Sequence, residues 1–407
     1  MMPNRFKALI LSISLVVVLF MVAGGLVVRA SDNNDGAYRQ LGVYSEVLSR
    51  IRSEYVEEPN IPRVTDGALH GLLESLDANS SYLNPDQYRE YKAHKREGKA
   101  DIGAAISKRF GYAAIIAVVP GGPADKAGIE GSDIIESIEN QSSRDMSLAE
   151  IRDKLSGTPG SNVVVSIVRA RRAEPQKITI TRDVVSFPPV SEKMLEEQIG
   201  YIKADVINKG KAQEIAAKVK SLQREGAKKL ILDLRDCADG DEAEGVTVAN
   251  LFLNHGTIAY LQGQKYPRQT FNADPSKAVT NLPLVVMVNR GTAGPAEIVA
   301  GAIMENGRGD VVGDKTFGVG SVQKLIEIPD GSALILSIAK YYTPSGKAIQ
   351  DTAITPNVLV ADADQDAVLP DDDSGPTSDQ ERKIEKQHED DQLHKAIDVL
   401  KTRQAKS

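Results

Sequence analysis

The 407-residue chain has no tryptophan and only one cysteine, Cys237. With one cysteine, no intramolecular disulfide can form. No histidine lies near Cys237 in the sequence, and the neighbouring carboxylates of Asp236 and Asp239 would raise the pKa of its thiol. We therefore interpret Cys237 as a small, half-buried residue at a strand end, and not as a nucleophile.

The chain also lacks an excess of positive charge. Its formal net charge is −7 and its isoelectric point is about 5.5. This balance gives no indication of nucleic-acid binding. The aspartates between residues 362 and 373 lack the spaced oxygen ligands and the glycine turn of a calcium loop. We therefore predict no metal site and no cofactor.

An apolar, uncharged stretch lies near the N-terminus. It runs from Ala8 to Val28 and follows the basic flank Arg5 to Lys7. About 20 such residues span a bilayer, and a basic flank ahead of them favours an N-in orientation. We expect residues 1–30 to be a signal anchor; the alternative is a signal peptide cleaved near Ala30. Either way, the body would lie outside the cytoplasm, on the periplasmic side of the inner membrane.

Residues 37–97 have the pattern of a helical arm. Leu41, Tyr44 and Val47 recur at helical spacing, and a second apolar set runs from Ala68 to Leu76. Such an arm commonly contacts other subunits or packs against the core.

Residues 98–183 change to short β-type runs at 114–119, 134–138, 163–168 and 178–180. Residues 184–360 then alternate strand and helix patterns, which indicates a sheet with helices packed on it. An acidic segment at 361–390 has the composition of a disordered linker. Residues 391–407 close the chain with one short amphipathic helix, expected to dock on the body or on a neighbouring subunit.

The stretch from Asn289 to Gln323 has the layout of an active site. The apolar run 284–288 ends in a glycine-rich turn, Pro295 then occupies a first helical position, and a second glycine-rich loop follows at 316–320. A strand that turns sharply into a helix N-terminus is a common way to present a nucleophile beside free backbone N–H groups.

This stretch resembles the catalytic core of the C-terminal processing peptidases, tail-specific serine proteases with a Ser/Lys dyad. Their turn reads like S/T-A-S-A-S-E and their loop like T-F-G-K-G-x-V-Q. This chain has TAGPAE at 292–297 and TFGVGSVQ at 316–323. The resemblance places the nucleophilic serine of the family on Gly294 and its general-base lysine on Val319. Gln323, which matches the glutamine that orients the lysine, is retained.

The resemblance extends to the loop that helps to hold the oxyanion. In the family this loop reads like N-N-P-G-G or D-N-S-G-G, and here residues 236–240 read DCADG. Asp239 replaces the first glycine and Gly240 keeps the second. A carboxylate at this point would oppose the negative charge of an oxyanion.

Residues 98–183 resemble a PDZ domain, through a Gly-x-Pro-Ala-x-x-Ala-Gly-Ile pattern at 121–129 followed by Asp-Ile-Ile. PDZ domains bind a terminal carboxylate on a loop and add the peptide as an extra strand. The resemblance implies that Asp101 lies near the mouth of the site, where its charge would weaken carboxylate capture. The predicted peptide-binding residues are Ile102, Gly103, Ala104, Ala105 and Ile106.

The predicted fold is therefore an α+β to α/β multidomain protein with an N-terminal helical arm, a β-rich PDZ-like domain, a larger crotonase-like α/β peptidase core and a C-terminal tail with a short helix. Since Gly294 and Val319 carry no reactive group, we expect an inactive relative that binds C-terminal or unfolded polypeptides. Its partners would include the membrane and an oligomer, either of itself or with an active relative. The alternatives are an endopeptidase with a non-standard site, using a nearby Thr292, Ser321, Lys315 or Lys324, and an oligomer scaffold.

Overall fold

The computed structural model describes residues 39–94, 100–109, 111–169, 174–361 and 391–402. Residues 1–68 and 69–407 form two units, and each is described by itself. The predicted anchor at 1–30 and nearly all of the predicted acidic linker lie outside the described residues. Within the described ranges, no helix is both long enough and apolar enough to cross a bilayer.

The first unit contains a helix at residues 39–54 and the start of α2 (Ile61–Glu74). The Asn60 side chain accepts a hydrogen bond from the Arg63 N–H at 3.1 Å and so caps α2. The predicted arm is not wholly helical. In the second unit, strand β1 (Ser81–Leu83) comes before α3 (Pro85–His94). The Asp77 carboxylate accepts from the Ser80 N–H, and this bond turns the chain directly ahead of β1.

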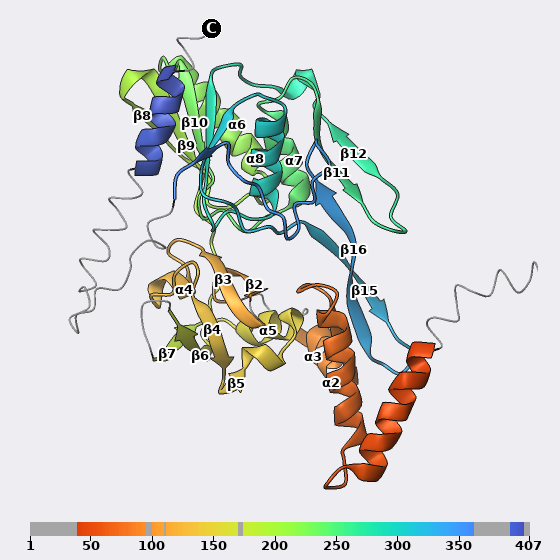
Figure 1. Ribbon diagram of the computed structural model, residues 1–407. Helices are drawn as coiled ribbons and strands as arrows, with labels where there is room; N and C mark the ends of the chain where they lie inside the picture. Colours follow the sequence, from red (N-terminus) through yellow and green to blue (C-terminus); the bar gives the residue numbers. More distant parts are fainter. Residues whose placement is uncertain (1–38, 95–99, 110, 170–173, 362–390, 403–407) are drawn as a thin grey trace, which may run out of the picture. The chain divides into compact units, whose positions relative to one another are not determined.

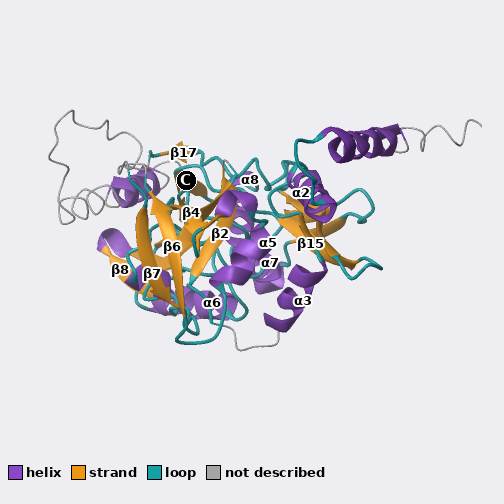
Figure 2. Ribbon diagram, turned by 90° about the horizontal axis from the view of Figure 1, so that it is seen from below, coloured by secondary structure: helices purple, strands orange, loops and turns teal. Residues whose placement is uncertain are grey.

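The region predicted to be PDZ-like forms an antiparallel sheet in the order β2-β3-β4-β6-β7, and Figure 2 labels β2, β4, β6 and β7 of this sheet. Helix α5 (Leu148–Leu155) lies beside β2 and begins with a capping box between Ser147 and Glu150. Its residues Ile151 and Leu155 enter the same buried core as the inward side chains of the sheet. The elements are β2 (Ala104–Arg109), β3 (Tyr112–Val118), α4 (Pro123–Lys126), β4 (Ile134–Ile138), β5 (Gln141–Ser142), β6 (Asn162–Val168) and β7 (Gln176–Thr181).

The larger core is built on a second sheet in the order β17-β14-β13-β10-β9-β8. Its strands are parallel except β8, which pairs antiparallel with β9. Every residue of β10 and β13 is buried, as expected for central strands covered on both faces. The strands are β8 (Ser191–Leu195), β9 (Ile199–Lys203), β10 (Lys229–Asp233), β13 (Leu284–Val288), β14 (Asp310–Gly313) and β17 (Val358–Leu359).

Helices cover both faces of this sheet (Figure 1). Helices α6 (Lys211–Arg224), α7 (Glu242–Asn250) and α8 (Pro295–Glu305) share one buried core with one face. The helix at 391–402 packs Ala396 and Leu400 on the other face. Of the two expectations for this helix, docking on the body is the one that the structure shows.

A third sheet flanks the core, in the order β1-β16-β11-β12 with β15 paired to β16. The second glycine-rich loop leads directly into β15, so this sheet fixes where the loop leaves the core. Its other strands are β11 (Thr257–Gln262), β12 (Gln269–Asn272), β15 (Ser321–Glu327) and β16 (Ala333–Tyr342).

Candidate functional site

The turn between β13 and α8 keeps the shape that presents a nucleophile. Gly294 has φ 60° and ψ −120°, a conformation that residues with a side chain adopt only under strain. A Cβ added at Gly294 would meet no atom within 4 Å. The position therefore has room for a side chain, while glycine relieves the strain and leaves the turn without a reactive group.

One buried carboxylate joins this turn to the loop ahead of β15. Glu297 accepts hydrogen bonds from the backbone N–H groups of Gly294 (3.0 Å), Gly318 (2.9 Å) and Val319 (2.8 Å) and from the Thr316 hydroxyl. The N–H groups of Gly294 and Val319 share one oxygen, Oε2, so these two positions lie side by side. Burial raises the pKa of Glu297 to about 7, against the lowering effect of its donors.

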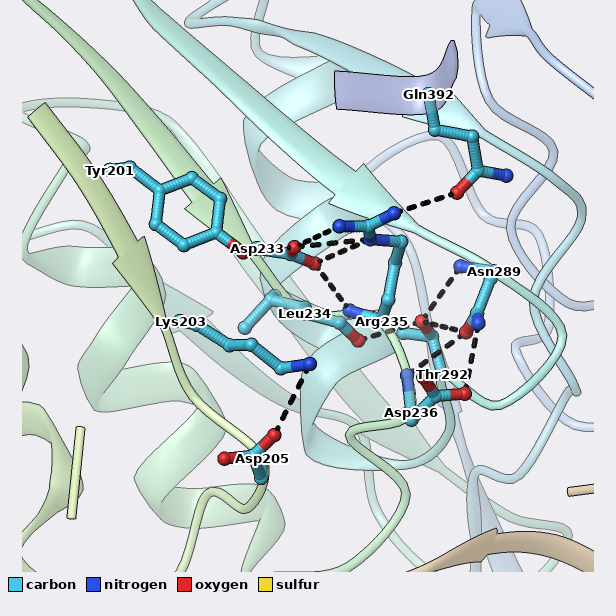
Figure 3. Close-up of polar contacts among 10 residues, drawn as sticks. All are labelled: Tyr201, Lys203, Asp205, Asp233, Leu234, Arg235, Asp236, Asn289, Thr292 and Gln392. Atoms are coloured by element: carbon cyan, nitrogen blue, oxygen red, sulfur yellow. Dashed lines mark hydrogen bonds and ion pairs between the residues drawn. The ribbon is translucent and has the colours of Figure 1, made fainter. Parts of the chain in front are cut away.

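A second network supports the turn from behind (Figure 3). Asn289 Oδ1 accepts from the N–H of Asp236, and its Nδ2 donates to Asp236 Oδ1 at 2.9 Å. The Thr292 hydroxyl donates to the Leu234 carbonyl at 2.8 Å and accepts from the Asn289 N–H at 3.0 Å. Thr292 is fully buried, and its hydroxyl is engaged in these two hydrogen bonds.

A buried ion pair anchors the end of β10. Asp233 accepts from the Arg235 guanidinium and from the Tyr201 hydroxyl, both at 2.6 Å (Figure 3). Burial alone would raise the pKa of Asp233, but the charge and hydrogen bonds of Arg235, together with Lys203 and the Tyr201 hydroxyl, hold this pKa below its usual value. Arg235 also donates to Gln392 at 3.4 Å, which links the loop after β10 to the C-terminal helix.

The predicted oxyanion loop has its glycine N–H already occupied. Gly240 donates this N–H to Asp239 Oδ1 at 2.8 Å. Gly240 has φ +141°, and an added Cβ would lie 2.2 Å from the Ile207 carbonyl oxygen, so only glycine fits. In strand–turn–helix hydrolase sites the residue after the nucleophile supplies the second N–H. Here that residue is Pro295, which has none.

The predicted carboxylate-binding loop is occupied in the same way. Asp101 Oδ1 accepts from the Gly103 N–H at 2.5 Å. Gly103 has φ +70°, which glycine adopts without cost. The loop carbonyls are used as well, since Ile102 accepts from Ala124 and Gly103 from Val119. The loop is therefore tied to α4 and to the end of β3.

A cavity of about 430 Å³ gathers the candidate residues of both domains. All of the predicted site residues line it except Gly103, whose N–H belongs to the loop beside it. Those from the peptide-binding strand are Ile102, Ala104, Ala105 and Ile106, and those from the core are Asp239, Gly240, Gly294, Val319 and Gln323.

Hydroxyl and carboxylate groups line this cavity, among them Ser321, Asp239 and Glu242. None of the lining residues is histidine, lysine or cysteine, and Lys315 and Lys324 are exposed elsewhere. The Ser321 hydroxyl accepts from Asn79 at 3.1 Å and from Gln323 at 2.8 Å, and both of these partners are amides. In the described part of the chain, no group of three or more His, Cys, Asp or Glu residues is placed to hold a metal ion.

Cys237 is fully buried, so the expectation of a half-buried side chain was wrong in degree. Burial first, and then the carboxylates of Asp205 and Asp239, raises the pKa of its thiol well above the usual value. The thiol is therefore a packed core group and not a reactive one.

Sequence reasoning overlooked several residues of the site. Arg152 of α5 lines the cavity and donates to the Ile106 carbonyl at 3.1 Å, and Glu242 opens α7 against the same space. Nothing in the local pattern marks Arg152, because it reaches the cavity from an element distant in sequence, and Glu242 lies just beyond the loop that the resemblance covers. Glu297 did carry a signal, since it stands three residues after the N-cap position Gly294, as in a capping box.

Comparisons with known proteins agree with this architecture. The family model Peptidase family S41 matches residues 198–360, and a PDZ domain model matches residues 115–169. The carboxy-terminal-processing protease of Bartonella bacilliformis is 30% identical over 357 residues, which cover 84% of this chain and 82% of that protein. The carboxyl-terminal-processing protease of Picosynechococcus is 33% identical over 319 residues, 76% of each chain.

A solved structure, the photosystem II D1 C-terminal processing protease, has 25% sequence identity and a TM-score of 0.65, and the match covers 81% of this chain and 94% of that one. The PDZ domain, the sheet core and the strand–turn–helix site together define a PDZ-containing protein of the peptidase type. The chain belongs to the C-terminal processing proteases of peptidase family S41. The resemblance and the fold class inferred from the sequence are thus confirmed.

Proposed function

We propose that this family member binds C-terminal or unfolded segments of other proteins and does not cut them. The observation that carries this proposal is the shared Glu297 oxygen. It holds Gly294 beside Val319, the positions where the hydroxyl and amine of a Ser/Lys dyad would meet. Gly294 has no side chain that could attack a carbonyl, and the side chain of Val319 cannot take a proton.

The surroundings of this pair support the same conclusion. An oxyanion needs preorganised donors, and losing a single donor costs about 10²–10³ in rate. The Gly240 N–H is bound to a carboxylate, and Pro295 has no N–H to offer. An oxyanion would therefore meet negative charge at the point where active sites place donors.

The binding part of the proposal rests on the PDZ domain. Its strand β2 lies at the edge of the sheet and lines the cavity, so a peptide can add to it as a further strand. We place this activity outside the cytoplasm, at the periplasmic face of the inner membrane, with residues 1–30 as anchor or cleaved signal. An adaptor of this kind would act as a homo-oligomer or beside an active relative.

The test measures binding and cleavage on the same protein. A fluorescein-labelled unfolded peptide of about ten residues should raise its anisotropy with the purified chain, and mass spectrometry should find it intact after a day. Gly103→Val should abolish binding, because a β-branched residue does not tolerate the φ of +70° and would distort the loop. Gly121→Val is the matched control, with φ +73° in the same domain and no cavity contact.

Two results would overturn the proposal. Degradation of casein that Gln323→Ala abolishes would show an active endopeptidase. Absence of any peptide binding by the folded wild-type protein would leave only a scaffold role.

A further inference from the structure

Residues 102 and 104–106 line part of the cavity, and we call this part of the cavity the groove. A side chain of the protein itself contacts the backbone at each end of it. At one end the Asp101 carboxylate accepts from the Gly103 N–H at 2.5 Å. At the other end the Arg152 guanidinium donates to the Ile106 carbonyl at 3.1 Å. The carboxylate lies where a PDZ loop would receive the carboxylate of a peptide C-terminus.

The fold holds the Asp101 carboxylate in place. The backbone of Asp101 exchanges two hydrogen bonds with Asp183, at 3.1 and 3.2 Å. This bridge fixes the chain directly ahead of the loop, and Gly103 then turns back with φ +70°. An aspartate two residues before a backbone N–H is the geometry of an Asx turn, which forms without help from a ligand. The acceptor is therefore present before any peptide arrives.

The charge around the groove acts in the same direction. Three carboxylates, Asp101, Asp239 and Glu242, line the cavity against the single guanidinium of Arg152. Desolvation raises the pKa of Asp101 in spite of the hydrogen bond from Gly103, and Asp239 adds to the increase. Carboxylates that line the same cavity disfavour the binding of a further anion there.

We propose that Asp101 is a specificity-determining residue that turns this groove away from free C-terminal carboxylates and toward internal, extended segments of unfolded proteins. This inference rests on the proposed peptide-binding function. A terminal carboxylate must displace Asp101 from the Gly103 N–H and approach its charge. An internal strand brings no charge to that point and can pass the loop with the Asx turn intact.

The experiment compares one fluorescein-labelled apolar peptide in two forms, with a free C-terminal carboxylate and with a C-terminal amide. Wild-type protein should bind the amide at least as tightly as the free acid. Asp101→Ala exposes the Gly103 N–H and removes the charge, and it should shift the preference at least about tenfold toward the free acid. Asp101→Asn keeps an acceptor oxygen and removes only the charge, so it should shift the preference by less.

Asp125→Asn is the matched control. Asp125 also accepts from a glycine N–H, that of Gly121 at 2.7 Å, but it does not line the cavity. This variant should keep the wild-type preference, and circular dichroism should show that all variants are folded. If wild type prefers the free acid tenfold, or if Asp101→Ala leaves the preference unchanged, Asp101 does not set specificity while peptide binding stands. If neither peptide form binds wild type or Asp101→Ala, the binding function and this inference both fall.

Discussion

Two loops beside one cavity each contain a glycine whose N–H donates to an aspartate of the same loop. Gly103 of the PDZ loop donates to Asp101 at 2.5 Å, and Gly240 of the core loop donates to Asp239 at 2.8 Å. In the PDZ domain a side chain also contacts the backbone of this strand edge, since Arg152 donates to the Ile106 carbonyl. In the core the hydrogen bond of Gly240 accompanies the missing hydroxyl, the missing amine and the missing N–H of Pro295.

The two loops differ in how many substitutions would be needed to free their donors. One substitution would free the N–H of the PDZ loop, whereas the core would need four substitutions to supply a hydroxyl, an amine and two free N–H donors. The frame of the core is nevertheless intact, since Glu297 and Thr292 still hold the turn and the second loop together. These contacts hold the backbone of the site in place whatever side chains stand at positions 294 and 319.

The largest expected effect comes from rebuilding the core site. Gly294→Ser with Val319→Lys should leave the protein inactive, because no free donor then receives the oxyanion. Adding Asp239→Gly and Pro295→Ala restores two donors, each worth about 10²–10³ in rate. Release of fluorescence from labelled casein should therefore be at least about 10²-fold faster for the fourfold variant than for the double variant.

The matched control for this series is Asp239→Gly with Pro295→Ala alone, which should remain inactive. If the double variant cleaves casein as fast as the fourfold variant, the carboxylate of Asp239 and the missing N–H of Pro295 do not block chemistry.

The next effect is on stability and tests whether the core has kept its frame. Glu297→Gln replaces one acceptor oxygen by an NH₂ group that faces backbone N–H donors. Leaving such groups unpaired should lower the free energy of unfolding by about 3–5 kcal/mol. Gln323→Ala, on the exposed cavity side, should change it by less than about 0.5 kcal/mol. Urea denaturation measures both, and equal effects would contradict the separation of a stabilising frame from a cavity face.

Much of the fold could be predicted, because its main elements have strong local patterns. The five buried residues of β13 and the helical spacing of α6 are visible in the sequence. The short strands β1, β8 and β12 were not predicted, since their residues alternate weakly and their pairing partners are distant in sequence.

The site was predictable in its positions but not in its contacts. Motif matching pointed to Gly294, Val319 and Asp239, and the structure brings them to one cavity. It gave no sign that Arg152 reaches the same cavity from α5, because that depends on how the two domains of this unit pack. The hydrogen bonds from Gly103 and Gly240 to the preceding carboxylates needed backbone geometry as well as residue types.

The smallest effect expected is the pH dependence that Glu297 adds to stability. The carboxyl of an unfolded glutamate ionises near 4.5, and burial in the folded protein raises the pKa of Glu297 to about 7. Between these values the folded chain keeps a proton that the unfolded chain releases, so stability should fall as the pH rises through this window. The slope is at most about 1.4 kcal/mol per pH unit. Urea denaturation of wild type and Glu297→Gln from pH 4 to 8 isolates this slope, which should vanish in the variant and flatten above pH 7 in the wild type. A wild-type slope equal to that of the variant would mean that the hydrogen-bond donors outweigh burial and keep Glu297 ionised throughout this pH range.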